Sequence, residues 1–265
     1  MPYLSIGDYK IYYEDYPSLI NNAESYPLVF LHGFSLDHRL WLDDAQYFRQ
    51  WYRVLLLDSK GHGLSDAPLT GYSRDDRVTE VINFMDELAI EKIHLVGLSM
   101  GGTTGIGFAL KYPQRLSSLT LVSTSAEGYK AGMKLSKIDE LAKEKGVEAA
   151  RQKWIETALL WYKDDKKDIA NKLHQMMIDY SGSVWRDPMR GKYPKTNDLE
   201  YVDSIEIKTK IFTGELDKLF LPLAIELNKR IPHSELSIFP DVGHIVNLEA
   251  PSRFWQELKL FLESV

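Results

Sequence analysis

The chain has 265 residues and a mass of 30.5 kDa, enough to bury one large hydrophobic core or two modest ones. Its composition, 44% hydrophobic and 26% charged, is ordinary for a globular protein, and the absence of cysteine excludes disulfides and thiolate metal sites. The net charge of -6 and an isoelectric point of 5.7 argue against a nucleic-acid-binding surface and give no reason to expect attraction to anionic lipid.

The N-terminal sequence MPYLSIGDYK lacks a basic start followed by an apolar stretch, so we expect no signal peptide. No apolar run approaches the roughly 20 residues that a membrane-spanning helix needs. We therefore expect a cytoplasmic protein with neither a membrane nor a nucleic-acid partner. The sequence does not indicate its oligomeric state.

Strands and helices alternate in the first half of the chain. Residues 4–13 alternate apolar and polar side chains around a central Gly-Asp turn, which predicts an antiparallel hairpin. Ser73 is a suitable cap for the helical apolar repeat of residues 78–88, and Pro113 ends a second helical run, Thr103–Tyr112. The other predicted strands are short and almost wholly apolar: Leu28–Leu31, Val54–Leu57, Ile93–Val96 and Leu119–Val122.

Apolar strands of this length suit a parallel sheet covered on both faces, and their alternation with helices indicates right-handed βαβ units. The alternation breaks at about Glu127, and residues 127–199 show only helical patterns. The helices predicted there are Ile138–Lys145, Val147–Lys163 and Lys166–Tyr180.

Sheet-like runs return in the last third of the chain, at Ile207–Thr213 and Glu235–Phe239, with helices at Pro222–Arg230 and Ser252–Leu262. The simplest interpretation is an α/β fold with a mostly parallel, doubly wound sheet and an N-terminal antiparallel hairpin. Its core comprises residues 1–126 and 200–265, and residues 127–199 form a helical insertion.

The segment Gly97-Leu-Ser-Met-Gly101 fits the pattern G-x-S-x-G, with a predicted strand before it and a helix after it. A strand-to-helix turn this sharp strains the backbone at Ser99 and leaves no room for side chains at the flanking glycines. The turn aims the Ser99 hydroxyl outward, and the helix N-terminus favours negative charge developing there. The alternative is a glycine-rich turn without chemistry, but the flanking strand and helix favour a nucleophile.

A serine nucleophile needs a base, and the base needs an acid to orient it. His244 follows the last predicted strand in a glycine-containing loop, at the edge where open α/β sheets build their sites. The alternative is an ordinary surface-loop histidine. Asp217 follows the preceding strand and reaches the same edge, with Glu215 and Asp241 as rival carboxylates. The chain order Ser99, Asp217, His244 is that of one known triad arrangement.

An oxyanion hole is expected from the backbone N–H groups of Phe34 and Met100. A predicted strand runs into His32-Gly33-Phe34, where the glycine lets the chain turn and expose an amide. His32 is expected to fix this loop rather than act as a base, and His62 is expected to be structural too.

Five motifs occur in order: His32-Gly-Phe34, Asp58-Ser-Lys-Gly-His-Gly-Leu-Ser65, Gly97-Leu-Ser-Met-Gly-Gly102, Gly214-Glu-Leu-Asp217 and Gly243-His244. Together they resemble the α/β-hydrolase superfamily over nearly the whole chain apart from the helical insertion. Within it the sequence looks most like small carboxylesterases and 3-oxoadipate enol-lactonases. The resemblance implies that the insertion is a cap over the active site. Two positions depart from the usual pattern: Lys60 replaces an arginine, and Pro222 lies one residue later than is common.

In this superfamily, a serine at the turn argues against dehalogenases and epoxide hydrolases, which use a carboxylate nucleophile. No histidine pair or carboxylate cluster indicates a metal, and a serine triad needs neither metal nor organic cofactor. We therefore expect a serine hydrolase that forms an acyl-enzyme with small-molecule carboxylic esters or lactones. Enol-lactone and C–C bond hydrolysis are alternatives. A ligand receptor on the hydrolase scaffold is another, since fold alone does not imply function.

Trp154, Trp161 and Trp185 are the candidate pocket residues of the insertion. Trp154 and Trp161 are seven residues apart, which places them on one face of the predicted helix. This stripe lines an apolar pocket in one interpretation. In the other, which is the commoner case for such stripes, it packs the insertion onto the main fold.

Overall fold

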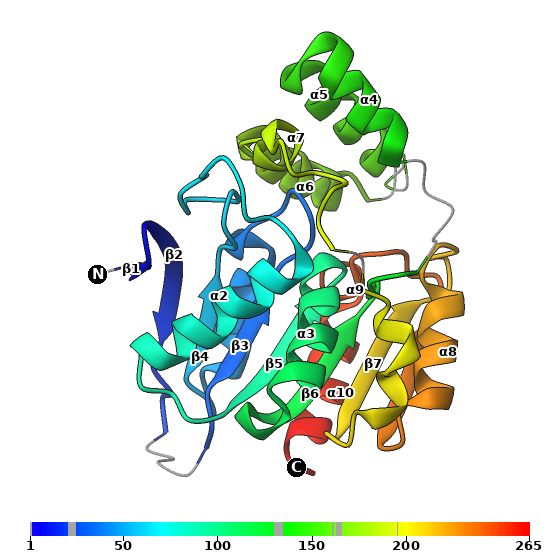
Figure 1. Cartoon of the computed structure of the whole chain (residues 1–265). Helices are drawn as coiled ribbons and strands as arrows, with labels where there is room; N and C mark the ends of the chain where they lie inside the picture. The colour runs from blue at the N-terminus through cyan, green and yellow to red at the C-terminus, as the bar shows by residue number, and fades with distance from the viewer. Residues whose placement is uncertain (1, 21–24, 130–134, 161, 163–165, 195) are drawn as a thin grey trace.

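The computed structural model describes residues 2–20, 25–129, 135–160, 162, 166–194 and 196–265. Its strands form one sheet in the order β1-β2-β4-β3-β5-β6-β7-β8 (Figure 1). β2 pairs antiparallel with β1 and β4, and every other neighbouring pair is parallel. The strands are β1 (Tyr3–Ile6), β2 (Tyr9–Tyr16), β3 (Leu28–Leu31), β4 (Val54–Leu57), β5 (Ile93–Leu98), β6 (Leu116–Val122), β7 (Thr209–Gly214) and β8 (Ser234–Phe239).

The central strands are buried on both faces, which explains their continuous apolar sequences. The predicted hairpin and all the predicted strands are confirmed, with shifts at some ends. β6 starts at Leu116, three residues before the predicted apolar run. The strand can include polar residues there because they find hydrogen-bond partners inside the sheet. Ser118, for example, is buried and its Oγ lies 2.8 Å from His94 Nδ1. Apolar character alone does not detect such a residue.

Helices cover both faces, so the sheet is doubly wound. α2 (Arg74–Glu87), α3 (Met100–Lys111) and α8 (Leu221–Arg230) share one hydrophobic cluster with the sheet. α1 (Leu42–Phe48), α9 (Val246–Glu249) and α10 (Pro251–Leu262) share the other. Ser73 caps α2 as expected: its Oγ accepts from the Asp76 N–H at 3.1 Å, and Asp76 accepts from the Ser73 N–H at 2.9 Å.

The helices of the insertion lie beyond the carboxyl ends of the parallel strands, above the sheet in Figure 1. They are α4 (Leu135–Lys145), α5 (Val147–Leu159), α6 (Lys167–Asp179) and α7 (Ser183–Arg186). α5 is described to Leu159, and its predicted end at Lys163 lies outside the described residues. The domain limits 127 and 199 stay predictions.

The insertion is joined to the core by apolar contacts. Leu173 and Met177 of α6 belong to the same hydrophobic cluster as Leu36 of the core. Tyr180 and Trp185 form a smaller cluster that includes Tyr72, just before α2. No helix in the described part of the chain is both long and apolar enough to cross a membrane.

Candidate active site

Ser99 occupies the sharp turn between β5 and α3, with φ 55° and ψ -107°. A positive φ is unfavourable for a residue with a side chain, so neighbouring groups must hold the strained conformation. The Ser99 N–H donates to the Val122 carbonyl at 2.9 Å, and its carbonyl accepts from the Thr103 N–H at 3.0 Å. The adjacent strand and the first turn of α3 therefore fix the serine.

The glycines on either side of Ser99 are required by close packing. A Cβ at Gly97 would lie 2.4 Å from the Gly101 carbonyl carbon, and one at Gly101 would lie 2.4 Å from the Leu31 carbonyl oxygen. Neither contact is sterically possible, and backbone atoms cannot move away as a flexible side chain could. The crowding expected from the sequence is present in the folded chain.

His244 and Asp217 meet at the same edge of the sheet. His244 Nδ1 lies 2.7 Å from Asp217 Oδ2, and the side chains are 27% and 4% exposed. With the Nδ1 proton directed at Asp217, a neutral imidazole presents Nε2 as an acceptor. The rival acid Glu215 instead accepts from the Asp241 N–H at 3.4 Å. The geometry thus pairs His244 with Asp217 and not with either rival.

Backbone contacts hold the two loops together. The Leu216 N–H donates to the Val242 carbonyl at 2.9 Å. A Cβ at Gly214 would lie 2.1 Å from the Gly243 carbonyl oxygen. The loop after β7 and the loop after β8 therefore pack backbone to backbone, which fixes the separation of acid and histidine.

Glu249 holds the His244 loop in place through two hydrogen bonds to its backbone. Its carboxylate accepts from the Gly243 N–H at 2.8 Å and from the Ile245 N–H at 3.0 Å, the residues on either side of His244. Its side chain is 1% exposed, and Lys166 of the insertion pairs with it. The sequence does not single out Glu249, because an acid five residues after a histidine is not a specific signal.

The backbone N–H groups of Phe34 and Met100 are available near Ser99. Among the described residues, neither donates a hydrogen bond to a backbone or side-chain acceptor. Met100 opens α3, where the first N–H groups of a helix have no partner within the helix. Both groups can therefore serve an incoming oxyanion, and their assignment to that role stays a prediction.

His32 and His62 are held in the core. His32 Nδ1 donates to the Gly33 carbonyl at 2.8 Å, and its Nε2 accepts from the Ser59 N–H at 3.0 Å. The His62 ring stacks on Tyr180, with 4.7 Å between centroids. Burial lowers the pKa of both imidazoles, so both are neutral at pH 7.

An apolar cavity opens over Ser99, Asp217 and His244, which all line it. Its walls come from both parts of the molecule. The core supplies Gly33, Phe34, Leu36, Leu98, Leu216, Leu219, Phe220 and Ile245, and the insertion supplies Trp154, Ala158, Tyr162, Leu173 and Met177. A concave, mostly apolar site with a few converging polar groups is the usual form of a small-molecule site.

Comparison with known proteins gives the same fold. A family model described as alpha/beta hydrolase fold matches residues 26–251. The chain belongs to this family. It is 29% identical to "Putative 2-succinyl-6-hydroxy-2,4-cyclohexadiene-1-carboxylate synthase" of Bacillus subtilis, over 90% of each chain. It is 27% identical to 3-oxoadipate enol-lactonase 1 of Acinetobacter baylyi, over 93% of this chain and 92% of the relative.

A thermophilic esterase from Thermogutta terrifontis has a similar structure, with a TM-score of 0.83 and 23% identity. The match covers 98% of this chain and 96% of that one. At this identity the likeness shows the shared fold alone. The protein is a hydrolase of the α/β-hydrolase family, and its relatives include a carboxylesterase of Bacillus subtilis and the enol-lactonase.

The three tryptophans predicted to line the pocket of this α/β hydrolase differ in where they lie. Trp154 lines the apolar cavity, and its Nε1 donates to Ser35 Oγ at 2.6 Å. Trp185 packs edge-on against Phe34, with 5.7 Å between centroids, and lines a second cavity beside Ser99. Trp161 lies outside the described residues. Trp154 therefore has both of the roles considered for the tryptophan stripe, since it lines the cavity and packs the insertion onto the core.

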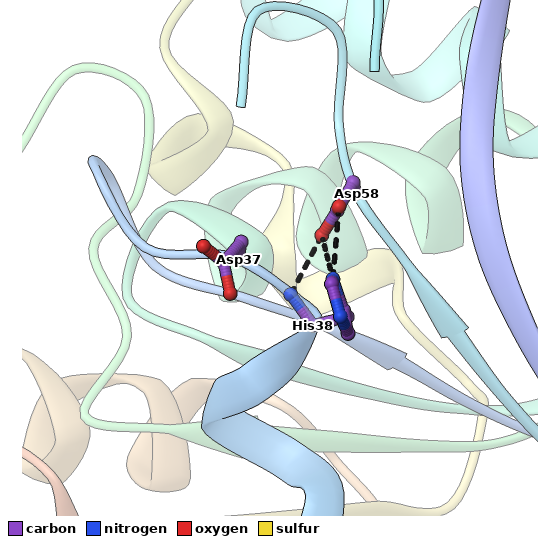
Figure 2. A group of neighbouring side chains, drawn as sticks. All are labelled: Asp37, His38 and Asp58. Atoms are coloured by element: carbon purple, nitrogen blue, oxygen red, sulfur yellow. Dashed lines mark hydrogen bonds and ion pairs between the residues drawn. The ribbon is translucent and has the colours of Figure 1, made fainter. Parts of the chain in front are cut away.

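Asp37, His38 and Asp58 form a buried group with metal-ligand chemistry (Figure 2). Both Asp58 oxygens lie within 3.0 Å of His38 Nδ1, and Oδ1 also accepts from the His38 N–H at 2.6 Å. Arg39 donates to both oxygens of Asp37. Burial lowers the pKa of His38, but the hydrogen bond and charge of Asp58 outweigh it and raise that pKa. Protein donors already use both carboxylates, so the group ties two loops together and gives no argument for a metal.

Proposed function

We propose that the protein is a serine hydrolase of small to medium carboxylic esters or lactones, with Ser99 as nucleophile, His244 as base and Asp217 as orienting acid. The observation that carries the proposal is the 2.7 Å contact between His244 and Asp217 in the cavity that Ser99 also lines. The strained backbone of Ser99 supports the same assignment, because strain of this kind clusters at functional sites. The esterase and enol-lactonase relatives support the substrate class.

In the proposed reaction, Ser99 Oγ attacks the substrate carbonyl while His244 Nε2 takes the hydroxyl proton. Asp217 holds the imidazole by its Nδ1 and stabilises the cation that forms. The tetrahedral oxyanion receives hydrogen bonds from the Phe34 and Met100 N–H groups. His244 then gives its proton to the leaving alcohol, which leaves an acyl group on Ser99.

Deacylation repeats these steps with water. His244 removes a proton from a water molecule, which attacks the acyl carbonyl and releases the acid from Ser99. No metal or organic cofactor enters either half of the proposed reaction. A lactone follows the same course, except that the alcohol and the acid leave as one molecule.

The test is a steady-state panel of chromogenic esters, from acetyl to long acyl chains, with several lactones beside them. We expect multiple turnovers by the wild type and a loss of about 10³-fold or more in Ser99→Ala. Circular dichroism should show that the variant keeps the fold. No turnover across the panel by folded wild-type protein would contradict the proposal and favour C–C bond hydrolysis or a binding role.

A further inference from the structure

A second cavity opens from Ser99 on the side of α2. It is lined by polar and charged groups as well as aromatic rings, with a volume of about 250 Å³, against about 110 Å³ for the apolar cavity. The two cavities share Phe34, Ser99, Trp154 and Phe220. A substrate whose carbonyl lies at Ser99 therefore has two spaces for its two ends, one apolar and one that also contains charged groups.

Arg77 of α2 lines this second cavity in a fixed position. Its Nε donates to Thr104 Oγ1 at 3.0 Å, and its Nη1 donates to the Tyr72 carbonyl at 3.0 Å. Thr104 in turn donates to the Met100 carbonyl at 3.1 Å, at the start of α3. These bonds tie the guanidinium to the helix that carries the predicted oxyanion donor.

The charge of Arg77 has no direct counterion in the described part of the chain. No ion pair within 4.0 Å joins its guanidinium to a carboxylate of those residues, and its hydrogen bonds to them come from Nε and Nη1, not from Nη2. Glu127 lines the same cavity and is the carboxylate whose charge acts most strongly on the pKa of Arg77, without a direct ion pair or hydrogen bond between the two. The other arginine of the cavity, Arg190, is neutralised by Asp139 at 2.7 Å. A half-buried guanidinium whose Nη2 is free among the described residues can donate a charge-assisted hydrogen bond to a carboxylate.

The position of His244 indicates which end of the substrate, acyl or alcohol, lies in the second cavity beside Arg77. The base must reach the leaving oxygen, and His244 lines the apolar cavity but not the second one. Met100, with its predicted oxyanion donor, lines the second cavity. The alcohol therefore belongs in the apolar cavity, and the acyl chain belongs beside Arg77.

We propose that Arg77 forms a carboxylate-binding subsite, so that the preferred substrates are esters or lactones whose acyl part carries a second, free carboxylate. This inference rests on the proposed serine-hydrolase function and specifies its substrate class. A hemiester of a short dicarboxylic acid is the simplest substrate of this kind.

The experiment compares two esters with the same leaving group, 4-nitrophenyl hydrogen glutarate and its neutral methyl ester. The quantity is the ratio of kcat/KM for the anionic ester to that for the neutral one, after subtraction of the rate with Ser99→Ala. We expect the ratio to exceed one in the wild type and to fall about 10- to 100-fold in Arg77→Gln, as for loss of a charged hydrogen bond. Lys229→Gln, an exposed charge at the far end of α8, controls for the change in net charge.

A second variant keeps the test valid if Arg77→Gln does not fold. Thr104→Val removes the hydroxyl that holds Arg77 Nε, and we expect it to lower the same ratio by about 2- to 10-fold. A wild-type ratio near one, or a ratio that neither variant changes, would overturn the subsite and leave the serine-hydrolase proposal intact. Failure of the wild type to turn over either ester above the Ser99→Ala background would count against the serine-hydrolase proposal itself.

A second pair of substrates tests the assignment of the acyl end. 4-Nitrophenyl butyrate and its analogue with a carboxylate on the phenol ring carry the charge, when present, on the alcohol. We expect Arg77→Gln to change the anionic-to-neutral ratio of this pair by less than about twofold. A fall as large as that seen with the glutarates would show that the assignment of acyl and alcohol ends is wrong.

Discussion

The α/β core and the helical insertion are held in place by different kinds of contact. In the core, the turn at Ser99 and the loops at Asp217 and His244 are fixed by backbone hydrogen bonds and by glycines without room for a Cβ. The insertion meets the core through side chains. The ring of Phe34 packs on Trp154 at 5.2 Å between centroids and on Tyr180 at 5.3 Å.

Polar contacts between the two regions are also made by side chains of the insertion, as where Arg39 pairs with Asp179 and Arg74 pairs with Asp198. Trp154 donates to Ser35, and Lys166 pairs with Glu249 beneath the His244 loop. Side-chain contacts tolerate change better than a backbone turn does, because a neighbouring side chain can rearrange. We therefore expect substitutions in the core to affect the chemical step and substitutions in the insertion to affect substrate binding.

The largest effect is expected at the acid of the core. Asp217→Asn should lower kcat by about 10⁴-fold, because an amide cannot hold the required imidazole tautomer or stabilise its cation. Steady-state ester hydrolysis measures the loss, and Glu215→Gln is the matched control because Glu215 does not contact His244. Full activity in Asp217→Asn would show that another carboxylate orients His244.

The next effect concerns the stability of the core. Asp44 of α1 is 1% exposed and accepts from Trp255 Nε1 at 2.7 Å and from Asn247 Nδ2 at 2.9 Å. Burial, against the opposing effect of these hydrogen bonds, raises the pKa of Asp44 to about 7. The folded protein therefore holds this proton more tightly than the unfolded chain, so the associated stability is present below about pH 4 and is lost as the pH rises through about 7.

Asp44→Asn should remove this dependence. Relative to the wild type, its free energy of unfolding should rise by an amount on the order of 3 kcal/mol between pH 4 and pH 8. Urea denaturation at several pH values measures the difference. Asp43→Asn, at the exposed neighbouring residue, is the control and should show little change. A constant difference between Asp44→Asn and wild type across this range would contradict the raised pKa.

A smaller effect is expected where the two regions meet. Glu249→Gln keeps one acceptor for the two N–H groups beside His244 but loses the charge that binds Lys166, so kcat should fall by about 10-fold. Lys166→Met removes the ion pair with the insertion but leaves the Tyr162 hydroxyl on Glu249, so it should lower kcat by less. If Lys166→Met lowered kcat as much as Glu249→Gln, the insertion would take part in positioning His244, and the contrast between the regions would fail there.

The smallest effect is expected within the insertion. Trp154→Phe keeps an aromatic wall of the cavity but loses the hydrogen bond to Ser35, so KM for a medium-chain ester should rise by about 2- to 10-fold. We expect kcat to change less than KM, since Trp154 does not contact the histidine–aspartate pair. A change confined to kcat would show that the insertion contributes to the chemical step.

Much of the fold could be predicted from the sequence because its signals are local. Continuous apolar strands, the cap at Ser73 and the glycines around Ser99 each depend on residues a few positions apart. The family match confirms the predicted α/β-hydrolase fold. The sequence does not mark the strand ends where polar residues are buried, as at Ser118, because their partners come from other strands.

The residues of the candidate site also differ in whether a local sequence signal marks them. Sequence order and strand ends nominated Ser99, Asp217 and His244, but could not choose between Asp217 and Glu215 by distance. Glu249 and Arg77 have no specific sequence signal, since each acts through partners far away in the chain. Arg77, for example, is held by Thr104 on the neighbouring helix.

Local sequence signals suffice for the sheet, its hairpin and the strained turn at Ser99, because steric exclusion and apolar periodicity act between near neighbours. The pairing of His244 with Asp217 and the meeting of two cavities at Ser99 are visible only in the folded chain. The same structure showed that the guanidinium of Arg77 borders one of these cavities without a direct counterion among the described residues. These features depend on distances between loops that follow different strands, and only the packing of the whole chain sets such distances.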